Sequence, residues 1–367
     1  MDFDFPVRPS LRLTSTAGWE EYVNAPKPPD PPRLTRREYA SLTDRERFRY
    51  NVLRSMHHSN LGPFATPSVT RFRSQADPLV LGNFQDATRL RPSFGLDGQA
   101  GTGKSTAVYM LAREVWHMQI DLFGDKTRFG QVRAPVTRIS LKGSNTERAI
   151  NESFATSYSG RAVGRSSAQA LDRFFRYARE KETVLVIVDD FHFLENGDPV
   201  AISNHLKGIS EEVSATFILI GVGLATMPMW EDENSGVTPS LSQTSRRWTL
   251  LHMDSISVRT AEQRKEWATL LRTIDERIVL THHRPGDLPA MAELLFERTQ
   301  GSIQTLMDAV NLATKVAIDS GGERLTPTLL DSLILSRAAE DGTKRLRAEK
   351  ARRRQRRQPP EAPAAHD

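Results

Sequence analysis

Short apolar runs alternate with segments of helical periodicity through the middle of the chain. Continuous apolar runs at residues 184–188 (VLVIV) and 217–220 (FILI) are typical of central strands that helices cover on both faces. The β-like segments lie at residues 93–97, 136–141, 184–188, 216–222 and 249–251. Alternation of such segments with helical ones predicts an α/β domain with a parallel central sheet at residues 79–258.

After Thr260 the strand-like runs stop and only helical patterns follow. Thr260 and Gln263 have the spacing of a capping box, in which two side chains satisfy backbone amides at a helix start. Further helices are expected at residues 288–299 and 302–318, and from Thr326 onward. This pattern predicts a separate all-helical lid domain at residues 259–340.

Ahead of the sheet, residues 1–78 are interpreted as an N-terminal helical arm. Residues 25–33 (APKPPDPPR) are rich in proline, which favours an extended linker or docking segment. Capping boxes that begin at Thr35 and Thr43 predict two short helices. Residues 62–78 mix Pro, Ser and Thr without a clean period, so we expect them to connect the arm to the sheet.

Composition limits the chemistry available to the chain. Its 367 residues include no cysteine, which excludes disulfides, thiolate metal sites and cysteine nucleophiles. No apolar run approaches the roughly 20 residues of a membrane span, and the first residues lack the features of a signal peptide. We therefore expect a soluble, cytoplasmic protein.

Positive charge is concentrated near the end of the chain. The net charge is +5, but residues 344–357 (KRLRAEKARRRQRR) hold nine basic residues and one acidic residue, so the remainder carries −3. Residues 341–367 have too little apolar surface to repay the entropy of ordering, and we expect a disordered tail. Such a tail can contact DNA phosphates without reading sequence. A tail that only improves solubility or docks a protein is the alternative.

A phosphate-binding pattern, G-x-x-x-x-G-K-[ST], lies between a β-like run and a helical segment, which is the context that this pattern requires. The predicted nucleotide-binding residues are Gly98, Gln99, Ala100, Gly101, Thr102, Gly103, Lys104, Ser105 and Thr106. Glycines let successive amides turn towards a phosphate, and the helix N-terminus adds partial positive charge. Lys104 is expected to reach the β and γ phosphates of ATP as a catalytic residue, and Ser105 to bind Mg²⁺.

Two aspartates follow the apolar run at residues 184–188. In P-loop proteins the acidic residue at the end of such a strand holds Mg²⁺, so Asp189 is the second predicted metal ligand. Asp190 is the predicted catalytic residue that orients the attacking water. That residue is usually a glutamate, and aspartate is one methylene shorter, so hydrolysis is expected to be slow. His192 either relays the nucleotide state or is a hydrogen-bonded structural residue.

These motifs together resemble a known family. With residues 98–106, VLVIVDDFHFL at 184–194, ILIGVGL at 218–224 and the helical end, the chain resembles the TniB/TnsC-type transposition ATPases, which are AAA+ proteins. The resemblance covers roughly residues 15–338. It implies an ATPase that binds MgATP, forms homo-oligomers on DNA and directs a partner transposase, with or without a target-selector protein.

The resemblance also implies an arginine that reaches into the nucleotide site of a neighbouring subunit. Arg246 and Arg247 occupy the corresponding stretch, so one of them is the candidate for this catalytic role. The alternative is that both arginines line an exposed loop.

Two other functions fit the same motifs. An AAA+ replication initiator or helicase loader would need a sequence-reading module such as a winged helix, and the sequence after Thr326 shows no pattern for one. A non-hydrolysing scaffold that binds ATP statically fits the short Asp190 side chain. Measured phosphate release distinguishes this third function from an ATPase.

Overall fold

The structure is a computed structural model. It describes residues 11–26, 28–81, 91–141, 146–159, 166–191, 199–227, 230 and 248–357. The chain divides into two compact units. The sheet unit comprises Val7–Lys27 and Ala65–Asp254, and the helical unit comprises Met1–Pro6, Pro28–Phe64 and Ser255–Asp367.

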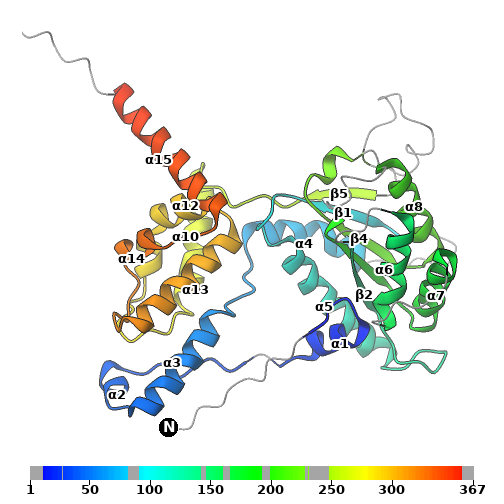
Figure 1. The fold of residues 1–367 in the computed structure, drawn as a ribbon, viewed down its shortest axis with the longest axis horizontal. Coiled ribbons are helices and arrows are strands. Elements are labelled where there is room, and N and C mark those ends of the chain that lie inside the picture. The colour runs from blue at the N-terminus through cyan, green and yellow to red at the C-terminus, as the bar shows by residue number, and fades with distance from the viewer. Residues whose placement is uncertain are drawn as a thin grey trace, which may run out of the picture. The chain divides into compact units, whose positions relative to one another are not determined.

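Five parallel strands form the sheet, in the order β2-β3-β4-β1-β5 (Figure 1). The strands are β1 Ser93–Asp97, β2 Val136–Ser140, β3 Leu185–Asp189, β4 Thr216–Ile220 and β5 Trp248–His252. Every residue of β1, β3 and β4 is buried, which requires cover on both faces. The predicted α/β fold with a parallel central sheet is confirmed.

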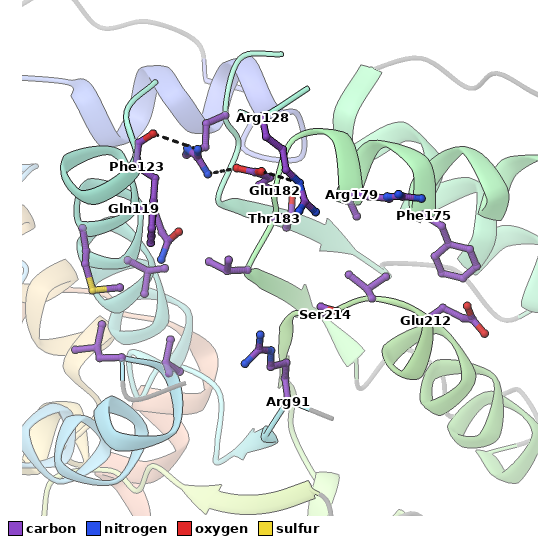
Figure 2. Close-up of a pocket in the computed structure, with 18 residues that line it drawn as sticks. Arg91, Gln119, Phe123, Arg128, Phe175, Arg179, Glu182, Thr183, Glu212 and Ser214 are labelled. Carbon is purple, nitrogen blue, oxygen red and sulfur yellow. Dashed lines mark hydrogen bonds and ion pairs between the residues drawn. The ribbon is translucent and has the colours of Figure 1, made fainter. Parts of the chain in front are cut away.

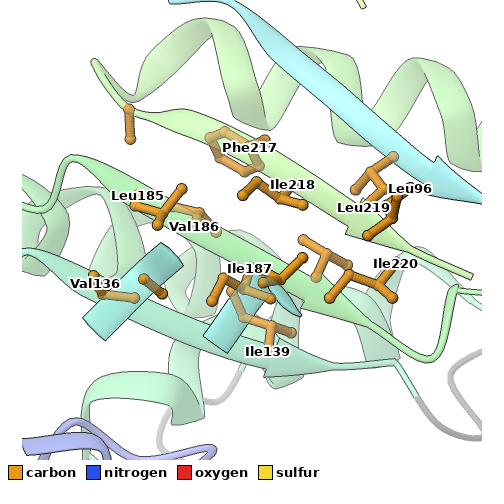
Figure 3. Packing of buried hydrophobic residues seen from close by; sticks show 14 of the residues in the cluster. Leu96, Val136, Ile139, Leu185, Val186, Ile187, Phe217, Ile218, Leu219 and Ile220 are labelled. Atoms are coloured by element: carbon orange, nitrogen blue, oxygen red, sulfur yellow. The ribbon is translucent and has the colours of Figure 1, made fainter. Parts of the chain in front are cut away.

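Helices supply this cover. Those of the sheet unit are α1 Thr16–Asn24, α4 Pro67–Val80, α5 Lys104–Phe123, α6 Glu147–Ser159, α7 Ser167–Glu180 and α8 Pro199–Glu212, with the short 3-10 helix η2 Leu224–Thr226. Apolar side chains of neighbouring strands, such as Leu96, Ile187 and Ile218, pack into one core (Figure 3). Trp19 and Val23 of α1 belong to the same core and are fully buried. The core therefore fixes the ends of the strands, where the site residues lie.

Residues 62–78, which were expected to connect the arm to the sheet, contain most of helix α4. The Thr66 side chain accepts a hydrogen bond from the Val69 amide at 3.2 Å, and Pro67 occupies the first turn, where its missing amide costs nothing. Buried residues recur every three or four positions, at Val69, Phe72, Ala76 and Val80. These four residues place one face of the helix in the core of the sheet unit.

The helical unit contains no strand among its described residues. Its helices are α2 Arg36–Ala40, α3 Asp44–His58, α10 Ala261–Asp275, α11 Asp287–Ala290, α12 Ala292–Thr299, α13 Ile303–Asp319, α14 Pro327–Ser332 and α15 Arg337–Arg357. The predicted capping boxes that begin at Thr35, Thr43 and Thr260 are all formed. In the described part of the chain, no helix is both long and apolar enough for a membrane span.

Helices α2 and α3, assigned to an N-terminal arm from the sequence, pack into the helical unit instead. The two terminal nitrogens of Arg54 donate hydrogen bonds to the two carboxylate oxygens of Glu323 at 2.7 and 2.8 Å. The exposed fractions of these side chains are 0% and 2%. Burial alone would raise the pKa of Glu323, but the hydrogen bonds from Arg54 and Thr281 lower it. This pair joins α3 to residues near the end of α13.

Helix α15 corrects the prediction that the chain is disordered from residue 341. Arg, Lys, Ala and Glu, which dominate this segment, are strong helix formers. The Thr343 hydroxyl donates to the carbonyl oxygen of Glu297 at 3.2 Å, and Lys350 forms an ion pair with the Glu297 carboxylate at 2.8 Å. Arg347 pairs with the same carboxylate at 2.6 Å. Contacts with Glu297 therefore hold this segment, although it has little apolar surface to bury.

Candidate nucleotide site

The loop between β1 and α5 holds the predicted phosphate-binding residues. Gly98, Gly101 and Gly103 have φ angles of +149°, +80° and +90°, which residues with a side chain rarely adopt. A Cβ atom on Gly98 would lie 2.2 Å from the carbonyl oxygen of Met253. The glycine pattern of the sequence is therefore required by the backbone, which turns tightly into the start of α5.

Lys104, the first residue of α5, reaches back over this loop. Its Nζ donates hydrogen bonds to the carbonyl oxygens of Gly98 at 2.5 Å and Gln99 at 2.7 Å. Burial lowers the pKa of the Lys104 ammonium group, although the negative charges of Asp97 and Asp189 oppose this effect. A phosphate group in the loop can replace the two carbonyl oxygens as the partner of this cation.

The other loop residues differ in burial. The buried Thr102 hydroxyl donates to the carbonyl oxygen of Gln99 at 3.0 Å, which tightens the turn. Gln99, Ala100 and Thr106 are exposed. The loop thus combines a fixed buried side with a side that a ligand can approach.

The structure brings together the two residues proposed as metal ligands. Ser105 Oγ lies 3.3 Å from Asp189 Oδ1, to which it donates a hydrogen bond. A hydroxyl and a carboxylate are the oxygen ligands that Mg²⁺ prefers, and Mg²⁺ in nucleotide sites takes only one or two carboxylates besides phosphate oxygens and water. The loop, Lys104 and this oxygen pair therefore fit a magnesium nucleotide.

Asp189 has two further side-chain partners, which the sequence analysis missed. Its Oδ2 accepts hydrogen bonds from the Tyr109 hydroxyl at 2.7 Å and from Arg138 at 2.9 Å. Burial, and then the charge of Asp189, raise the pKa of Tyr109. Burial would lower the pKa of Arg138, but Tyr109 and Asp189 raise it. The sequence feature that could have indicated this contact is Arg138 itself, a charged residue in the middle of a β-like run, at the third position of β2.

Asp190 lies just beyond β3 in a left-handed conformation with φ of +61°. Aspartate tolerates this region better than most residues do. Its Oδ2 accepts a hydrogen bond of 2.8 Å from Ser140 Oγ at the end of β2. This hydrogen bond orients the Asp190 carboxylate, next in the chain to the proposed metal ligand Asp189. Arg246, Arg247 and His192 lie outside the described residues.

A cavity of about 640 Å³ lies at the opposite edge of the sheet (Figure 2). Arg91, Val184 and Ser214 line it, and they precede β1, β3 and β4 respectively. Glu182 forms ion pairs there with Arg128, at 3.3 Å, and with Arg133. The phosphate loop and Asp189 instead follow β1 and β3, so this cavity is separate from the candidate nucleotide site.

Comparisons with known proteins bear on the fold that carries this site. Residues 89–225 match the AAA domain family. The Orc1 protein of Aeropyrum pernix, solved in complex with DNA, is similar with a TM-score of 0.53 and 15% identity, over 80% of this chain and 68% of that chain. Drosophila ORC bound to DNA gives a TM-score of 0.50 and 14% identity, over 86% and 72% of the two chains. No curated protein matches the sequence. Because identities this low show the fold alone, the conclusion is that the chain contains an AAA domain with the AAA+ P-loop fold.

Proposed function

We propose that the chain binds and hydrolyses MgATP and uses the nucleotide to control its own assembly on DNA. The convergence of Lys104, Ser105 and Asp189 at one edge of the sheet supports the nucleotide part most directly. The AAA domain match over residues 89–225, which contain all three residues, supports it further.

Each residue has a distinct role in this proposal. Lys104 exchanges its carbonyl partners for β and γ phosphate oxygens, and Ser105 and Asp189 hold Mg²⁺. When bound, Mg²⁺ supplies positive charge against the phosphate oxygens. Asp190 orients the attacking water, with Ser140 fixing its carboxylate. Arg246 or Arg247 of a neighbouring subunit stabilises the charge that develops during hydrolysis.

DNA binding is proposed from charge. The nine basic residues at 344–357 fall within α15, and two of them, Arg347 and Lys350, already pair with acidic residues of the helical unit. Exposed basic side chains that neutralise phosphates release counterions and give affinity that falls with salt and ignores sequence. The proposal therefore includes DNA contacts that are strong at low salt and independent of sequence.

Two biological settings fit this activity. Regulation of DNA transposition, with a partner transposase, is the preferred one because of the family resemblance at residues 98–106, 184–194 and 218–224. Replication initiation is the second candidate because Orc1, which has a similar fold, was solved in complex with DNA. An initiator would bind one origin sequence far more tightly than random DNA, whereas the transposition regulator would assemble equally well on both.

Electron microscopy of the protein with DNA, with and without ATP, tests the assembly. We expect ordered oligomers only with ATP and Mg²⁺. Replacing Arg246 and Arg247 with Ala should leave nucleotide binding intact and reduce hydrolysis by roughly 10³-fold. Turnover per subunit that survives this double change and does not vary with protein concentration would exclude a role in trans. Nucleotide binding without any phosphate release would favour the static scaffold.

A further inference from the structure

We propose that Arg138 competes with Mg²⁺ for Asp189, and that it thereby sets the Mg²⁺ concentration at which the site binds nucleotide. The inference rests on the proposed function of this site. Arg138 is on β2 and Asp189 ends β3, the neighbouring strand, with Ser140 opposite Asp189 in the register. The two charged side chains thus approach each other across a strand pair.

The Asp189 carboxylate already has a full set of partners in the protein. Its Oδ1 accepts from Ser105 Oγ at 3.3 Å and from the Asp190 amide at 3.0 Å. Its Oδ2 accepts from Tyr109 at 2.7 Å and from Arg138 at 2.9 Å. An ionised carboxylate offers about four lone-pair positions. Direct coordination of a metal by Asp189 therefore requires at least one of these donors to leave.

Arg138 is the donor that a divalent cation opposes most strongly. Ser105, Tyr109 and the Asp190 amide are neutral, whereas the guanidinium carries a full charge that repels Mg²⁺ at short range. The Arg138 and Asp189 side chains are only 14% and 7% exposed, so water screens this repulsion weakly. Of the four donors, the one whose departure the metal favours most is therefore the cation that already compensates Asp189.

The remaining contacts of Arg138 are weak enough for it to move. Its guanidinium carbon lies 5.4 Å from the centre of the Tyr109 ring, a cation–π contact. Its Nε is buried and has no hydrogen-bond partner among the described residues. An unpaired buried donor is unfavourable, and Nε can form a hydrogen bond with water when the side chain turns towards solvent. This gain lowers the cost of moving the Arg138 guanidinium. Asp189 is thus its strongest attachment.

The Mg²⁺ dependence of nucleotide binding tests this competition. The fluorescence of an ATP analogue with a methylanthraniloyl group is measured at fixed concentration while Mg²⁺ is titrated. Arg138→Met keeps most of the side-chain volume and removes the charge, and it should lower the half-saturating Mg²⁺ concentration by about tenfold or more. Tyr109→Phe removes a neutral donor from the same oxygen and should lower it only about two- to threefold.

A matched control separates this effect from the loss of any positive charge. Arg148 lies on α6 of the same unit, is 73% exposed and pairs with Glu152 at 3.0 Å. Arg148→Met should leave the Mg²⁺ midpoint unchanged. If Arg138→Met does not fold by circular dichroism, Arg138→Lys keeps a charge but loses the guanidinium geometry, and it should lower the midpoint by a smaller factor.

The outcomes distinguish this inference from the proposed function. Suppose that wild-type protein binds the analogue, but Arg138→Met leaves the Mg²⁺ midpoint unchanged or raises it. Arg138 then does not compete with the metal. The same conclusion follows from Arg138→Lys if Arg138→Met does not fold. If wild-type protein binds no nucleotide at any Mg²⁺ concentration, the proposed function fails and the inference fails with it. A lower midpoint in Arg138→Met with an unchanged Arg148→Met supports the competition.

Discussion

Ser105 Oγ donates a hydrogen bond to Asp189 Oδ1 across 3.3 Å, although 84 residues separate the two in the chain. Ser105 is the second residue of α5, which follows β1, and Asp189 ends β3, with β4 between the two strands in the sheet. Because the strands are parallel, their carboxyl ends lie at one edge, where ligands of such sheets bind. The serine hydroxyl and the aspartate are therefore available to one ligand.

Replacing Ser105 with Ala should weaken nucleotide binding only when Mg²⁺ is present. The change removes one proposed metal ligand but leaves Lys104 and the glycine loop, so we expect roughly tenfold weaker binding with Mg²⁺ and no change in EDTA. Isothermal titration calorimetry in both conditions measures this. Equal loss in the two conditions would mean that Ser105 contacts the nucleotide or supports the loop and does not bind metal.

Replacing Gly98 with Ala should disrupt the loop. The added Cβ meets the Met253 carbonyl oxygen at 2.2 Å, and the φ of +149° is unfavourable for alanine. Nucleotide binding should fall by at least about tenfold. Gly208→Ala in α8 is the control, because its Cβ meets nothing within 4 Å. That change should raise the free energy of unfolding by about 0.5–1 kcal/mol. Normal nucleotide affinity in Gly98→Ala would contradict the loop assignment.

Breaking the buried pair of Arg54 and Glu323 should strongly destabilise the helical unit. Arg54→Met leaves the Glu323 charge buried without its cation, which costs about 3–5 kcal/mol in the free energy of unfolding. Lys315→Met, which breaks the exposed pair with Asp319, should cost less than about 1 kcal/mol. Urea unfolding measures the free energy of unfolding of the two variants. Equal losses would show that the buried pair stabilises the helical unit no more than an exposed pair does.

The helical unit should lose stability in mild acid because of His58. Burial is the main cause that lowers the pKa of His58 to about 3, and nearby positive groups add to this effect. Its Nε2 accepts a hydrogen bond from the Val279 amide at 3.0 Å, which needs the neutral ring. The unfolded chain binds the proton near pH 6.5, so stability is complete above that pH and falls by about 1.4 kcal/mol per unit as the pH drops towards 3.

Urea unfolding between pH 7.5 and 5 checks this slope. His58→Gln retains an acceptor oxygen and cannot take up the proton, so its free energy of unfolding should depend less on pH over this range. Wild-type protein and His58→Gln with identical pH dependence would show that His58 does not cause the loss.

Local patterns made the sheet and the phosphate loop predictable. The run before Asp189 has the apolar character of a buried strand, and the glycines of residues 98–103 are required by positive φ angles within the loop itself. Such signals depend on neighbours in sequence, so one chain is enough to recognise them.

The place of α3, the partners of Asp189 and helix α15 could not be predicted, because they depend on contacts between residues far apart in the chain. Arg54 and Glu323 are 269 residues apart, so nothing local indicated that α3 belongs with the C-terminal helices. Arg138 and Tyr109 gain their roles only because β2 and α5 place them at Asp189. Helix α15 was missed because its acidic partners, such as Glu297, lie in another helix.

Nucleotide binding by Lys104→Ala tests the central claim most directly. The ammonium group is the only charged donor that the loop of residues 98–106 itself carries, and a hydrogen bond to a charged group contributes about 1.5–3 kcal/mol. Equilibrium binding of ATP with Mg²⁺ should therefore weaken roughly 10- to 150-fold relative to wild type, with Lys315→Ala unchanged. Equal affinity of wild-type protein and Lys104→Ala for MgATP would contradict the assignment of this site.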